Sequence, residues 1–589
     1  MKAATPRPRI GVALCTCRGE ISGGLDLTHL KAAALRLPDV VAVEEAGELC
    51  MKEGQEWLRE FILRNRIDRV VIGGCTPRLY EDTVARALVS VGLNRHTMEM
   101  VNLREQCVWP HRDKARATEK AELMLSAAVA RASSLEPLEP CPAPVTKAAL
   151  VLGGGVAGMQ AALDLARLGA RVYLVEATGG LGGRTYKLST TFPTQECKPD
   201  GCCIHYCREC VLTPKIEEVL QHPRIEVLLN SRLKELSGGL GAYRALLVTP
   251  TGQIEVMVGV IVVATGSRLI DARRFPELGY GIHPDVVTSL ELEEMAVEAR
   301  KSDGAIRRPS DGKTPNTISF IQCVGSRDTT GRGRAHCSLV CCTYAIGQAK
   351  ELKRRLPGAR IYIHYIDLRG PYRGFEEHYL EARQMGIEFV RGKVAEVKKS
   401  GGGLVVVAED IDTGRLLRIR TDLVVLSVGQ EASDGTDELS RLLRIPLDRD
   451  GFLREYNPAF DMLKRKGVAV VGCAAGPRGI RYSVEDARAA AAALGELLAA
   501  GEIEAEAVRA EVDESRCSGC RQCEALCPMG AITTKPRVDH KRGVKRVVAS
   551  VSPAQCSACG ACATACPSKA IAVRNHKLRQ LMDQIEALG

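Results

Sequence analysis

The sequence predicts a multidomain α/β protein that ends in a small cysteine-rich domain. Strands alternate with amphipathic helices over most of the chain, a glycine-rich turn follows a buried strand, and two dense cysteine runs lie near the C-terminus. At 589 residues the chain is too long for one hydrophobic core, and its length predicts roughly four domains. The predicted domains span residues 1–136, 146–500 and 508–575, followed by a C-terminal helix over 576–589.

The composition is that of an ordinary globular protein, with 45% hydrophobic residues, 26% charged residues and a net charge of +10. No run of about 18 apolar residues is present, so we expect no membrane-spanning helix. The 24 cysteines cluster in a long chain without a secretory signal, which indicates metal ligands in a reducing cytoplasm rather than disulfides.

The basic stretch Lys535–Arg546 lacks interleaved aromatic residues. We expect a solvated loop there, with docking of an acidic partner as the alternative, and no nucleic-acid binding.

Residues 9–135 alternate between strand and helix patterns, which predicts a doubly wound α/β domain. A proline-rich linker follows, with prolines from Pro137 to Pro144. The predicted strands are Ile10–Leu14, Val40–Glu44, Arg69–Ile72 and Thr97–Val101, and the predicted helices include Gln55–Asn65, Thr83–Val91 and Lys114–Ala132.

Cysteines follow the strands of this first domain. In a parallel sheet those positions share the carboxyl edge, where ligands bind, so the thiols could gather in one crevice with a cluster or redox role. The alternative is that they are buried as small hydrophobic residues. The five residues are Cys15, Cys17, Cys50, Cys75 and Cys107.

A dinucleotide-binding fingerprint opens the middle of the chain. The strand Ala148–Leu152 leads into a G-x-G-x-x-G turn made by Gly153, Gly155 and Gly158, and a helix and a second strand ending at Glu176 follow. The first glycine permits the tight turn, the second lets a pyrophosphate approach, and the third lets the helix pack on the strand. The helix N-terminus attracts the phosphates, and Glu176 can accept a hydrogen bond from a ribose hydroxyl.

No second fingerprint follows, although a reductase that binds two dinucleotides would need one. The strand Thr317–Gln322 is where we expect it, but four cysteines follow that strand instead. Adjacent cysteines fit no common zinc pattern, so we predict an iron–sulfur cluster here. Its predicted ligands are Cys323, Cys337, Cys341 and Cys342.

Another cysteine group lies between residues 197 and 210. Cys207 and Cys210 form a C-x-x-C pair, which is typical of a redox dithiol or of half a cluster site. Three more cysteines precede the pair without an assigned role, namely Cys197, Cys202 and Cys203.

Two runs of the form C-x2-C-x2-C-x3-C-P lie near the C-terminus, and this spacing predicts two [4Fe–4S] clusters. Structural zinc sites are the alternative, but they favour separated pairs of cysteines. In such runs the fourth cysteine reaches across to the other cluster. The predicted sets are Cys517, Cys520, Cys523 and Cys566 for one cluster, and Cys556, Cys559, Cys562 and Cys527 for the other.

A series of motifs extends over nearly the whole chain. In order they are Cys-x-Cys in the first domain, VLGGGVAGMQAALDLA, GGLGGRTYKL, TFPT before CVLTPK, QCVGSRD, CSLVCCTYAIGQA, VVGCAAGPRGI and the two terminal cysteine runs. This series resembles the A subunit of heterodisulfide reductase and its bacterial relatives. The resemblance implies a thioredoxin-reductase-like core that carries FAD, and it also supports the cluster that follows Thr317–Gln322.

Further site residues follow from the resemblance alone. It implies that Gly182, Gly183 and Arg184 of GGLGGR, and Gly266 at the end of VVATG, contact the FAD. It also matches Cys207 and Cys210 to the C-x-x-C pair of the family, which we expect to ligate a cluster.

The chain departs from the family pattern in two ways. Residues Val248–Val260 form a short loop and strand where long members insert a ferredoxin module, so this is a compact member. Gly347 stands where members that split electron pairs place a lysine, which argues against splitting. The amphipathic segment Leu578–Leu588 is expected to be a helix packed on its own ferredoxin domain, and the alternative is that it docks another protein of the same complex.

The resemblance implies an FAD- and iron–sulfur-dependent electron-transfer subunit in which no side chain acts as nucleophile or base. It would split or relay flavin electrons between a hydrogenase or NADH-oxidising module and a disulfide-reducing partner, and it allows a homodimer of the core subunit. One alternative is a component of a quinone-interacting oxidoreductase complex. Others are a self-contained NAD(P)H-dependent reductase that uses Cys207 and Cys210, and a scaffold whose clusters only bridge subunits.

Overall fold

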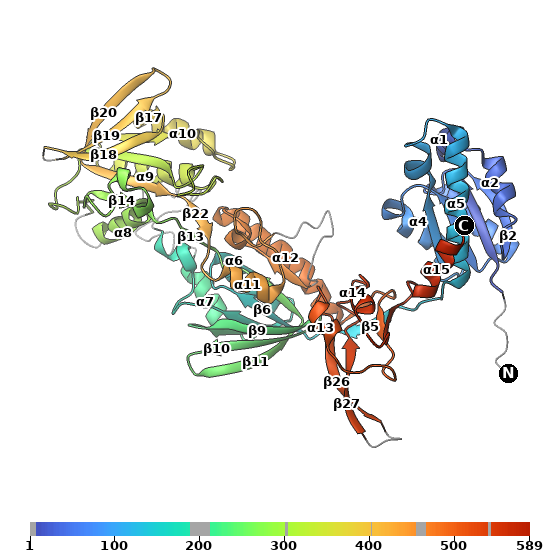
Figure 1. Cartoon of the computed structure of the whole chain (residues 1–589). Coiled ribbons are helices and arrows are strands. Elements are labelled where there is room, and N and C mark those ends of the chain that lie inside the picture. The colour runs from blue at the N-terminus through green and yellow to red at the C-terminus, as the bar shows by residue number, and fades with distance from the viewer. Residues whose placement is uncertain (1–6, 189–211, 301–303, 402, 455–466, 540–543) are drawn as a thin grey trace. The chain divides into compact units, whose positions relative to one another are not determined.

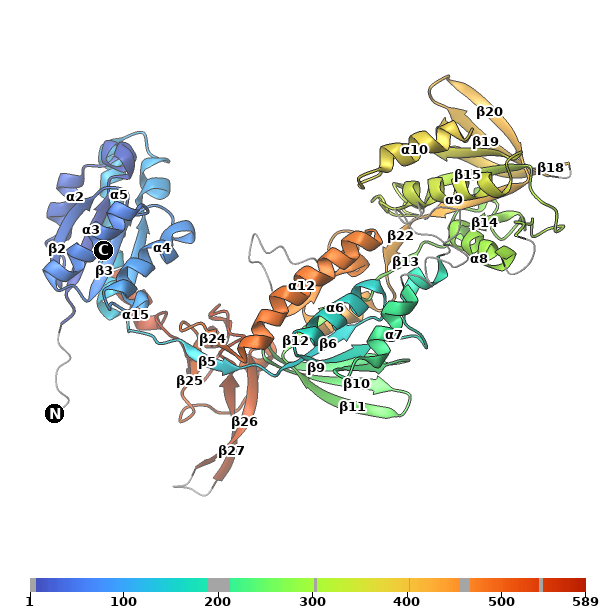
Figure 2. The ribbon, with the colours of Figure 1, turned by 180° about the vertical axis from the view of Figure 1, so that it is seen from behind.

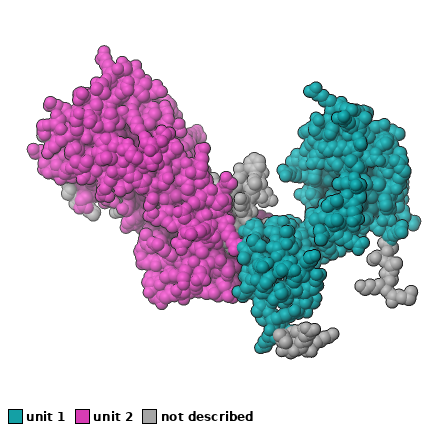
Figure 3. All heavy atoms as spheres, in the orientation of Figure 1, with its two compact units in different colours: residues 1–142, 504–589 teal, residues 143–503 magenta. Residues whose placement is uncertain are grey.

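The computed structural model describes residues 7–188, 212–300, 304–401, 403–454, 467–539 and 544–589. The chain divides into two compact units, one made of residues 1–142 with 504–589 and the other of residues 143–503 (Figure 3). The ranges predicted above for the three domains and the C-terminal helix stay a prediction. Among the described helices, none has the length and hydropathy needed to cross a bilayer.

The N-terminal part of the first unit is a parallel sheet of order β2-β1-β3-β4 with helices on both faces (Figure 1). One hydrophobic core lies under α2 and α5, and a second core lies under α3 and α4 on the opposite face. The doubly wound domain is therefore confirmed. The strands are β1 (Ile10–Cys15), β2 (Val40–Ala46), β3 (Arg69–Gly74) and β4 (Met98–Asn102), and the helices are α2 (Leu27–Ala34), α3 (Lys52–Asn65), α4 (Pro77–Ser90) and α5 (Lys114–Ser134).

The C-terminal part of this unit contains two antiparallel strand pairs, β25–β28 and β26–β27, and the short helices α13 and α14. The basic stretch forms part of the β26–β27 hairpin, so the expectation of a loop was wrong for its described residues. The Pro536–Arg537 region pairs with Arg546–Val547 in a regular ladder. The elements are β25 (Ala510–Val512), α13 (Gln522–Leu526), β26 (Ile532–Asp539), β27 (Val544–Val551), α14 (Ala561–Thr564) and β28 (Ile571–Val573).

The terminal helix α15 (Leu578–Glu586) packs on α5 of the N-terminal sheet, not on the cysteine-rich domain as expected. Polar contacts fix it there: the Gln580 side chain donates to the Ser134 carbonyl oxygen at 2.8 Å, and the Ser126 hydroxyl donates to the Ala587 carbonyl oxygen at 3.2 Å. The apolar positions alone could not reveal this arrangement, because its hydrogen bonds involve α15 residues outside the apolar stripe.

The second unit begins with a parallel sheet of order β23-β12-β6-β7-β8, which we call the glycine-rich half. Helices α6 and α12 lie side by side on one face (Figure 2), and an antiparallel sheet of β9, β10 and β11 packs on the other. The elements are β6 (Ala148–Leu152), α6 (Val156–Arg167), β7 (Arg171–Val175), α7 (Thr213–Gln221), β8 (Ile225–Leu228), β9 (Arg232–Gly239), β10 (Ala242–Thr249), β11 (Gly252–Val258), β12 (Val260–Val263), β23 (Val468–Val470) and α12 (Ile480–Ala500).

The same architecture occurs a second time, in what we call the cysteine half. Its parallel sheet has the order β14-β21-β15-β16-β17, with α8, α9 and α10 in one core and the antiparallel strands β18 and β19 in the other. The pair β13–β22 carries the chain into this half and back. The elements are β13 (Ser267–Leu269), β14 (Val286–Thr288), α8 (Ser289–Arg300), β15 (Thr317–Val324), α9 (Cys341–Arg355), β16 (Arg360–Tyr365), α10 (Phe375–Gln384), β17 (Glu388–Arg391), β18 (Val394–Ser400), β19 (Gly403–Asp410), β20 (Arg415–Thr421), β21 (Leu423–Val428) and β22 (Gln430–Ala432).

Candidate functional site

The turn between β6 and α6 leaves room for a phosphate group. Gly153 has a φ of +105°, and a Cβ there would lie 2.4 Å from the carbonyl oxygen of Ala264. A Cβ on Gly158 would lie 1.8 Å from the Gly153 oxygen, so the helix packs tightly on the turn. At Gly155, by contrast, no atom of the described residues lies within 4 Å of the Cβ position, and α6 begins at the next residue. Gly266 follows β12 at the same edge, so the arrangement fits a dinucleotide pyrophosphate.

Two segments hold this turn in place. One carboxylate oxygen of Glu176 accepts a hydrogen bond from the Gly154 N–H at 2.7 Å, and the other accepts one from the Thr178 N–H at 2.8 Å. The Gly182 N–H donates to the Gly154 carbonyl oxygen at 2.8 Å, and a Cβ on Gly183 would lie 3.2 Å from the Cα of Gly155. A carboxylate oxygen has two lone pairs, so the one that faces Gly154 can still accept a ribose hydroxyl.

Arg184 connects the two halves of the second unit. Its guanidinium donates to the carbonyl oxygen of Ser267, where the chain enters the cysteine half, and to the Ser267 hydroxyl at 3.2 Å. Burial lowers the pKa of Arg184, while the nearby Cys473, Tyr344 and Cys341 act in the opposite direction. This arginine therefore lies within electrostatic reach of a cysteine in the other half.

Four cysteines occupy the equivalent edge of the cysteine half. Cys323 lies in β15 with a φ of +60°, and Cys341 and Cys342 begin the 15-residue helix α9. Cys337 lies in the connecting loop, and the Cys342 Sγ accepts a hydrogen bond from the Arg369 N–H at 3.5 Å. The predicted four residues are thus brought together around the positive end of a helix dipole, which favours thiolates.

Burial and the mutual repulsion of thiolates disfavour the charged form of these cysteines. The pKa of Cys323 is raised to about 12, chiefly by burial and also by Cys342 and Cys337, while Arg327 acts in the opposite direction. Burial and the neighbouring thiols also raise the pKa of Cys341. Bound iron supplies the positive charge that stabilises such thiolates, so the donor set fits an iron–sulfur cluster.

The sequence analysis missed Tyr344. Its phenol bonds to the side chains of Cys341, Ser289 and Ser427, and burial raises its pKa well above the usual range. Ser427 also accepts a hydrogen bond from the Gln322 side chain at 3.0 Å. Tyr344 lies three residues after Cys341 and so on the same face of α9, which is the signal that could have identified it.

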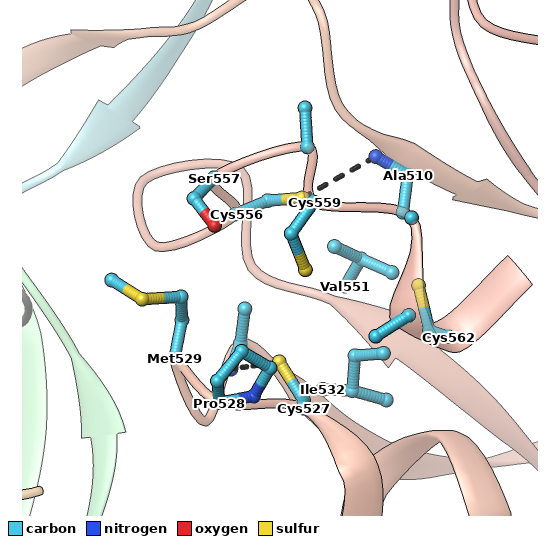
Figure 4. Close-up of a pocket in the computed structure, with 14 residues that line it drawn as sticks. Ala510, Cys527, Pro528, Met529, Ile532, Val551, Cys556, Ser557, Cys559 and Cys562 are labelled. Atoms are coloured by element: carbon cyan, nitrogen blue, oxygen red, sulfur yellow. Dashed lines mark hydrogen bonds between the residues drawn. The ribbon is translucent and has the colours of Figure 1, made fainter.

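In the C-terminal domain, Cys527 shares a pocket with three cysteines of the second run (Figure 4). The Ala510 N–H donates to the Cys556 Sγ at 3.3 Å, and Cys559 and Cys562 complete the lining. The pKa of Cys562 is raised to about 11, chiefly by burial and also by Cys556, Cys527 and Cys559. This is the cross-over set that the spacing predicts.

For the set of Cys517, Cys520, Cys523 and Cys566, contacts relate three of the four cysteines to one another. Burial raises the pKa of Cys523, and Cys517 and Cys520 act in the same direction, so these three thiols are neighbours. The Cys566 Sγ accepts a hydrogen bond from the Ala570 N–H at 3.2 Å. Its membership in this set stays a prediction.

In the N-terminal domain, four of the five cysteines gather at the carboxyl edge. The Cys17 and Cys75 sulfurs lie 3.7 Å apart, and the Arg104 guanidinium donates to the Cys17 sulfur at 3.6 Å. Burial raises the pKa of Cys15, and Cys17 and Cys50 raise it further. These contacts bring Cys15, Cys17, Cys50 and Cys75 together beside a cation.

Cys107 does not join them. It lies in the π-helical turn Arg104–Val108, where its thiol is 3.5 Å from the Met124 sulfur of α5, and it is fully buried in the core beneath that helix. For this residue the buried-hydrophobe alternative fits. Another prediction cannot be placed, because Cys207 and Cys210, like Cys197, Cys202 and Cys203, lie outside the described residues.

Two segments match known families. Residues 516–570 match the 4Fe-4S dicluster domain family, and residues 149–201 match the FAD dependent oxidoreductase family. The chain is therefore an oxidoreductase that uses FAD and [4Fe–4S] clusters. The predicted multidomain α/β fold class with a C-terminal two-cluster ferredoxin domain is confirmed, and the likeness of the flavin core to thioredoxin reductase stays a prediction.

Several proteins are similar over most of the chain. One from Archaeoglobus profundus, named as like the A subunit of heterodisulfide reductase, is 33% identical, over 90% of this chain and 92% of its own. The A subunit of the ferredoxin:CoB-CoM heterodisulfide reductase of Methanosarcina mazei is 35% identical, over 89% of this chain and 75% of its own. The A subunit of the H(2):CoB-CoM heterodisulfide,ferredoxin reductase of Methanothermobacter thermautotrophicus is 34% identical over 89% and 90%. The structure of a thioredoxin reductase from T. acidophilum covers 59% of this chain and 97% of its own, with 16% identity and a TM-score of 0.40.

Proposed function

The chain belongs to the family of heterodisulfide reductase A subunits, and we propose that it is the flavin- and iron–sulfur-dependent electron-transfer subunit of a heterodisulfide-reductase-like complex. One observation carries the proposal. Four strands of the cysteine half have the order of their counterparts in the glycine-rich half, but thiols stand where a second fingerprint would place a phosphate. In a self-contained reductase that edge would hold the nicotinamide nucleotide that reduces the flavin. Thiolates at this edge favour exchange of single electrons with a cluster instead.

The chain's own residues supply position and charge. When bound, FAD exchanges electrons in pairs or singly, whereas a [4Fe–4S] cluster exchanges one electron at a time. Gly155 and the N-terminus of α6 would receive the pyrophosphate, and Glu176 the ribose. Arg184 is anchored at Ser267 and is coupled electrostatically to Cys341. Its positive charge would therefore favour negative charge both on a bound flavin and on the Cys341 thiolate.

We assign the clusters to the cysteine sets that the spacing and the contacts support. The sharing of one pocket by Cys527 and the second run supports the cross-over arrangement. Cys207 and Cys210 are proposed as additional cluster ligands on the family pattern alone. The three sets are Cys517, Cys520, Cys523 with Cys566; Cys556, Cys559, Cys562 with Cys527; and Cys323, Cys337, Cys341 with Cys342.

The gathered thiols of the N-terminal domain are proposed as a further redox centre. Cys15, Cys17, Cys50 and Cys75 have the number and type of ligands that a cluster needs, and Arg104 offsets their negative charge. Neutral buried thiols would need no cation, which is why the contact from Arg104 favours the redox role over a packing role.

We propose relay of electrons rather than splitting of electron pairs. Gly347 lies on α9 at the position where the family resemblance places a lysine in splitting members. Lys350 follows one turn later, but it is buried, and its Nζ bonds to Glu381 and to the His378 Nδ1, the latter at 3.2 Å. Lys350 is therefore held by these partners and does not replace the missing ammonium.

The partners are proposed from the family. Relatives are named for the heterodisulfide, hydrogen and ferredoxin that they use, which supports a hydrogenase or NADH-oxidising module on one side and a disulfide-reducing partner on the other. Other subunits of the complex, and a homodimer of this chain, belong to the same proposal, in which the protein works in the cytoplasm. A role in a quinone-interacting complex would use the same flavin and the same clusters, with a different electron acceptor.

Anaerobic purification with quantified iron, sulfide and flavin, followed by titration with NADH, tests the proposal. We expect one FAD and about 12 to 16 iron atoms per chain, since each cluster holds four. We also expect no direct bleaching of the flavin by NADH. Two clusters with rapid reduction by NADH would contradict the proposal and would favour a self-contained reductase that uses Cys207 and Cys210 as a dithiol.

A further inference from the structure

The two cluster-binding runs of the C-terminal domain hold their sulfurs in the same way. The Cys527 and Cys566 sulfurs each accept a hydrogen bond from the N–H four residues later, at 3.3 and 3.2 Å. The Cys517 and Cys556 sulfurs each accept one from a neighbouring strand, at 3.5 and 3.3 Å. Cys520 and Cys559 are the exposed cysteines of the two runs. The backbone geometry therefore does not distinguish the two sites.

Charge does distinguish them. The sequence from Asp513 to Val551 contains eight lysines and arginines against four acidic residues, whereas Ser552–Lys569 contains one lysine and no acidic residue. The sequence segment that contains Cys520 is thus rich in cations, while the segment that contains Cys559 is almost uncharged. The described cations of the first region that we call the basic face are Arg516, Arg521, Lys535, Arg537 and Arg546, while Lys545 projects from the other side of the β26–β27 hairpin.

Contacts hold the cations of the basic face against the β26–β27 hairpin. Arg521, next to Cys520, is 64% exposed on its side chain and donates to the Thr534 hydroxyl of β26 at 3.2 Å. Glu514 lies 2.7 Å from the Lys535 ammonium and 3.6 Å from Arg537. Glu514 thus serves two cations and Glu524, which lies 3.9 Å from Arg521, serves a third, so the face keeps an excess of positive charge beside an exposed cysteine.

We infer that the basic face docks a redox protein whose surface around its own centre is acidic, and that electrons cross at Cys520. The inference rests on the proposed function, because it requires the cluster on the first set. In the step, one electron leaves the reduced centre of the partner and is gained by that cluster, with no bond or proton exchanged. Complementary charge accelerates the encounter of such partners and makes it sensitive to salt.

The test uses the complete holoprotein with the double substitution Arg521→Glu and Lys535→Glu. A reduced two-cluster bacterial ferredoxin, which is acidic, serves as the electron donor, and photoreduced deazariboflavin serves as an uncharged donor. We expect the rate with ferredoxin at low salt to fall at least about tenfold, and its dependence on salt to disappear. The rate with deazariboflavin and the iron content should stay unchanged.

The matched control is Arg86→Glu with Lys31→Glu in the N-terminal domain. Arg86 also donates to a threonine hydroxyl, at 3.3 Å, and Lys31 also pairs with a glutamate, at 3.2 Å. Equal rates for the two double variants would overturn the docking inference, as would a wild-type rate with ferredoxin that does not fall with added salt. Binding to anionic lipid vesicles without an effect on the ferredoxin rate would overturn it in favour of a membrane surface. Loss of iron from untreated wild-type protein would instead be a failure of the proposed function.

Discussion

The glycine-rich half and the cysteine half share the order of four adjacent strands, β12-β6-β7-β8 and β21-β15-β16-β17, yet different groups follow their central strands. After β6 comes a glycine turn with open space at Gly155, and after β15 come Cys323 and three further thiols. Both sites lie at the carboxyl edge of the sheet and at the N-terminus of the next long helix, α6 or α9. The fold therefore supplies the sheet edge and the positive end of a helix dipole in both halves. The residues that follow the strand decide whether this site binds a phosphate or stabilises thiolate ligands.

The likeness of the halves extends to their second strands. β7 reads RVYLV and β16 begins RIYIH. In each, the arginine lies over the tyrosine two residues later, with the guanidinium carbon 5.0 or 5.3 Å from the ring centroid. Each arginine also pairs with a glutamate of the next strand, at 2.9 Å to Glu226 and 3.2 Å to Glu388. The two halves thus share these surface contacts, although the residues at their ligand-binding edges differ.

Removal of the cysteine site should give the largest difference between the two halves, because it should affect iron content and leave flavin content unchanged. In Cys341→Ala with Cys342→Ala, we expect a loss of about four iron atoms per chain, the content of one [4Fe–4S] cluster, with FAD retained. Iron, sulfide and flavin analysis of the anaerobic protein measures both. Cys141→Ala is the control, because this half-exposed cysteine belongs to none of the proposed sets. Unchanged iron in the double variant would contradict the third cluster.

The converse change should remove flavin and keep iron. Gly155→Ala adds a methyl group where the structure has open space, so the fold is preserved while the approach of the pyrophosphate is blocked. We expect flavin affinity to fall by at least about tenfold, the equivalent of 1.4 kcal/mol. Flavin content and thermal unfolding of the flavin-free protein are the measurements. Gly358→Ala is the matched control, since its Cβ position is equally open. Equal flavin loss in both variants would rule out a specific pyrophosphate site at Gly155.

Much of this comparison could be predicted from local sequence. Strand positions such as Ile10–Leu14 and the turn at Gly153 follow from hydrophobic runs and glycine spacing, and the structure places them within a residue or two. The contacts of Arg184 with Ser267 could not be predicted, because they join segments 83 residues apart. The same holds for α15 on α5, where the partner helix lies more than 400 residues away along the chain.

Acid should affect the cysteine half through a residue that its counterpart lacks. His364 ends the RIYIH segment where β7 has Val175, and burial lowers the pKa of His364 to about 4. The unfolded chain takes up this proton near pH 6.5 and the folded chain does not, so stability is complete above that pH and falls as pH decreases toward 4.

We therefore expect His364 to cost about 2 kcal/mol of folding stability between pH 7.5 and pH 5. In His364→Val, which copies the other half, that part of the pH dependence should disappear. Thermal unfolding of both proteins at the two pH values measures it, and contributions from clusters are common to both. The same acid-induced loss in the variant would show that another group is responsible.

The finest distinction between the halves is a hydrogen bond at the cluster edge. Tyr344 bonds to Cys341, and hydrogen bonds to ligand sulfurs raise the potential of a cluster because they stabilise its more negative, reduced form. A net contribution of about 0.5–1.5 kcal/mol corresponds to roughly 20–60 mV for one electron, so Tyr344→Phe should lower one midpoint potential by that amount. A redox titration followed by electron paramagnetic resonance resolves this signal from those of the C-terminal clusters. Tyr362→Phe, on β16, is the control. If the two variants give the same potentials, the phenol only fills space, and the cysteine half tunes its centre through the helix terminus and burial alone.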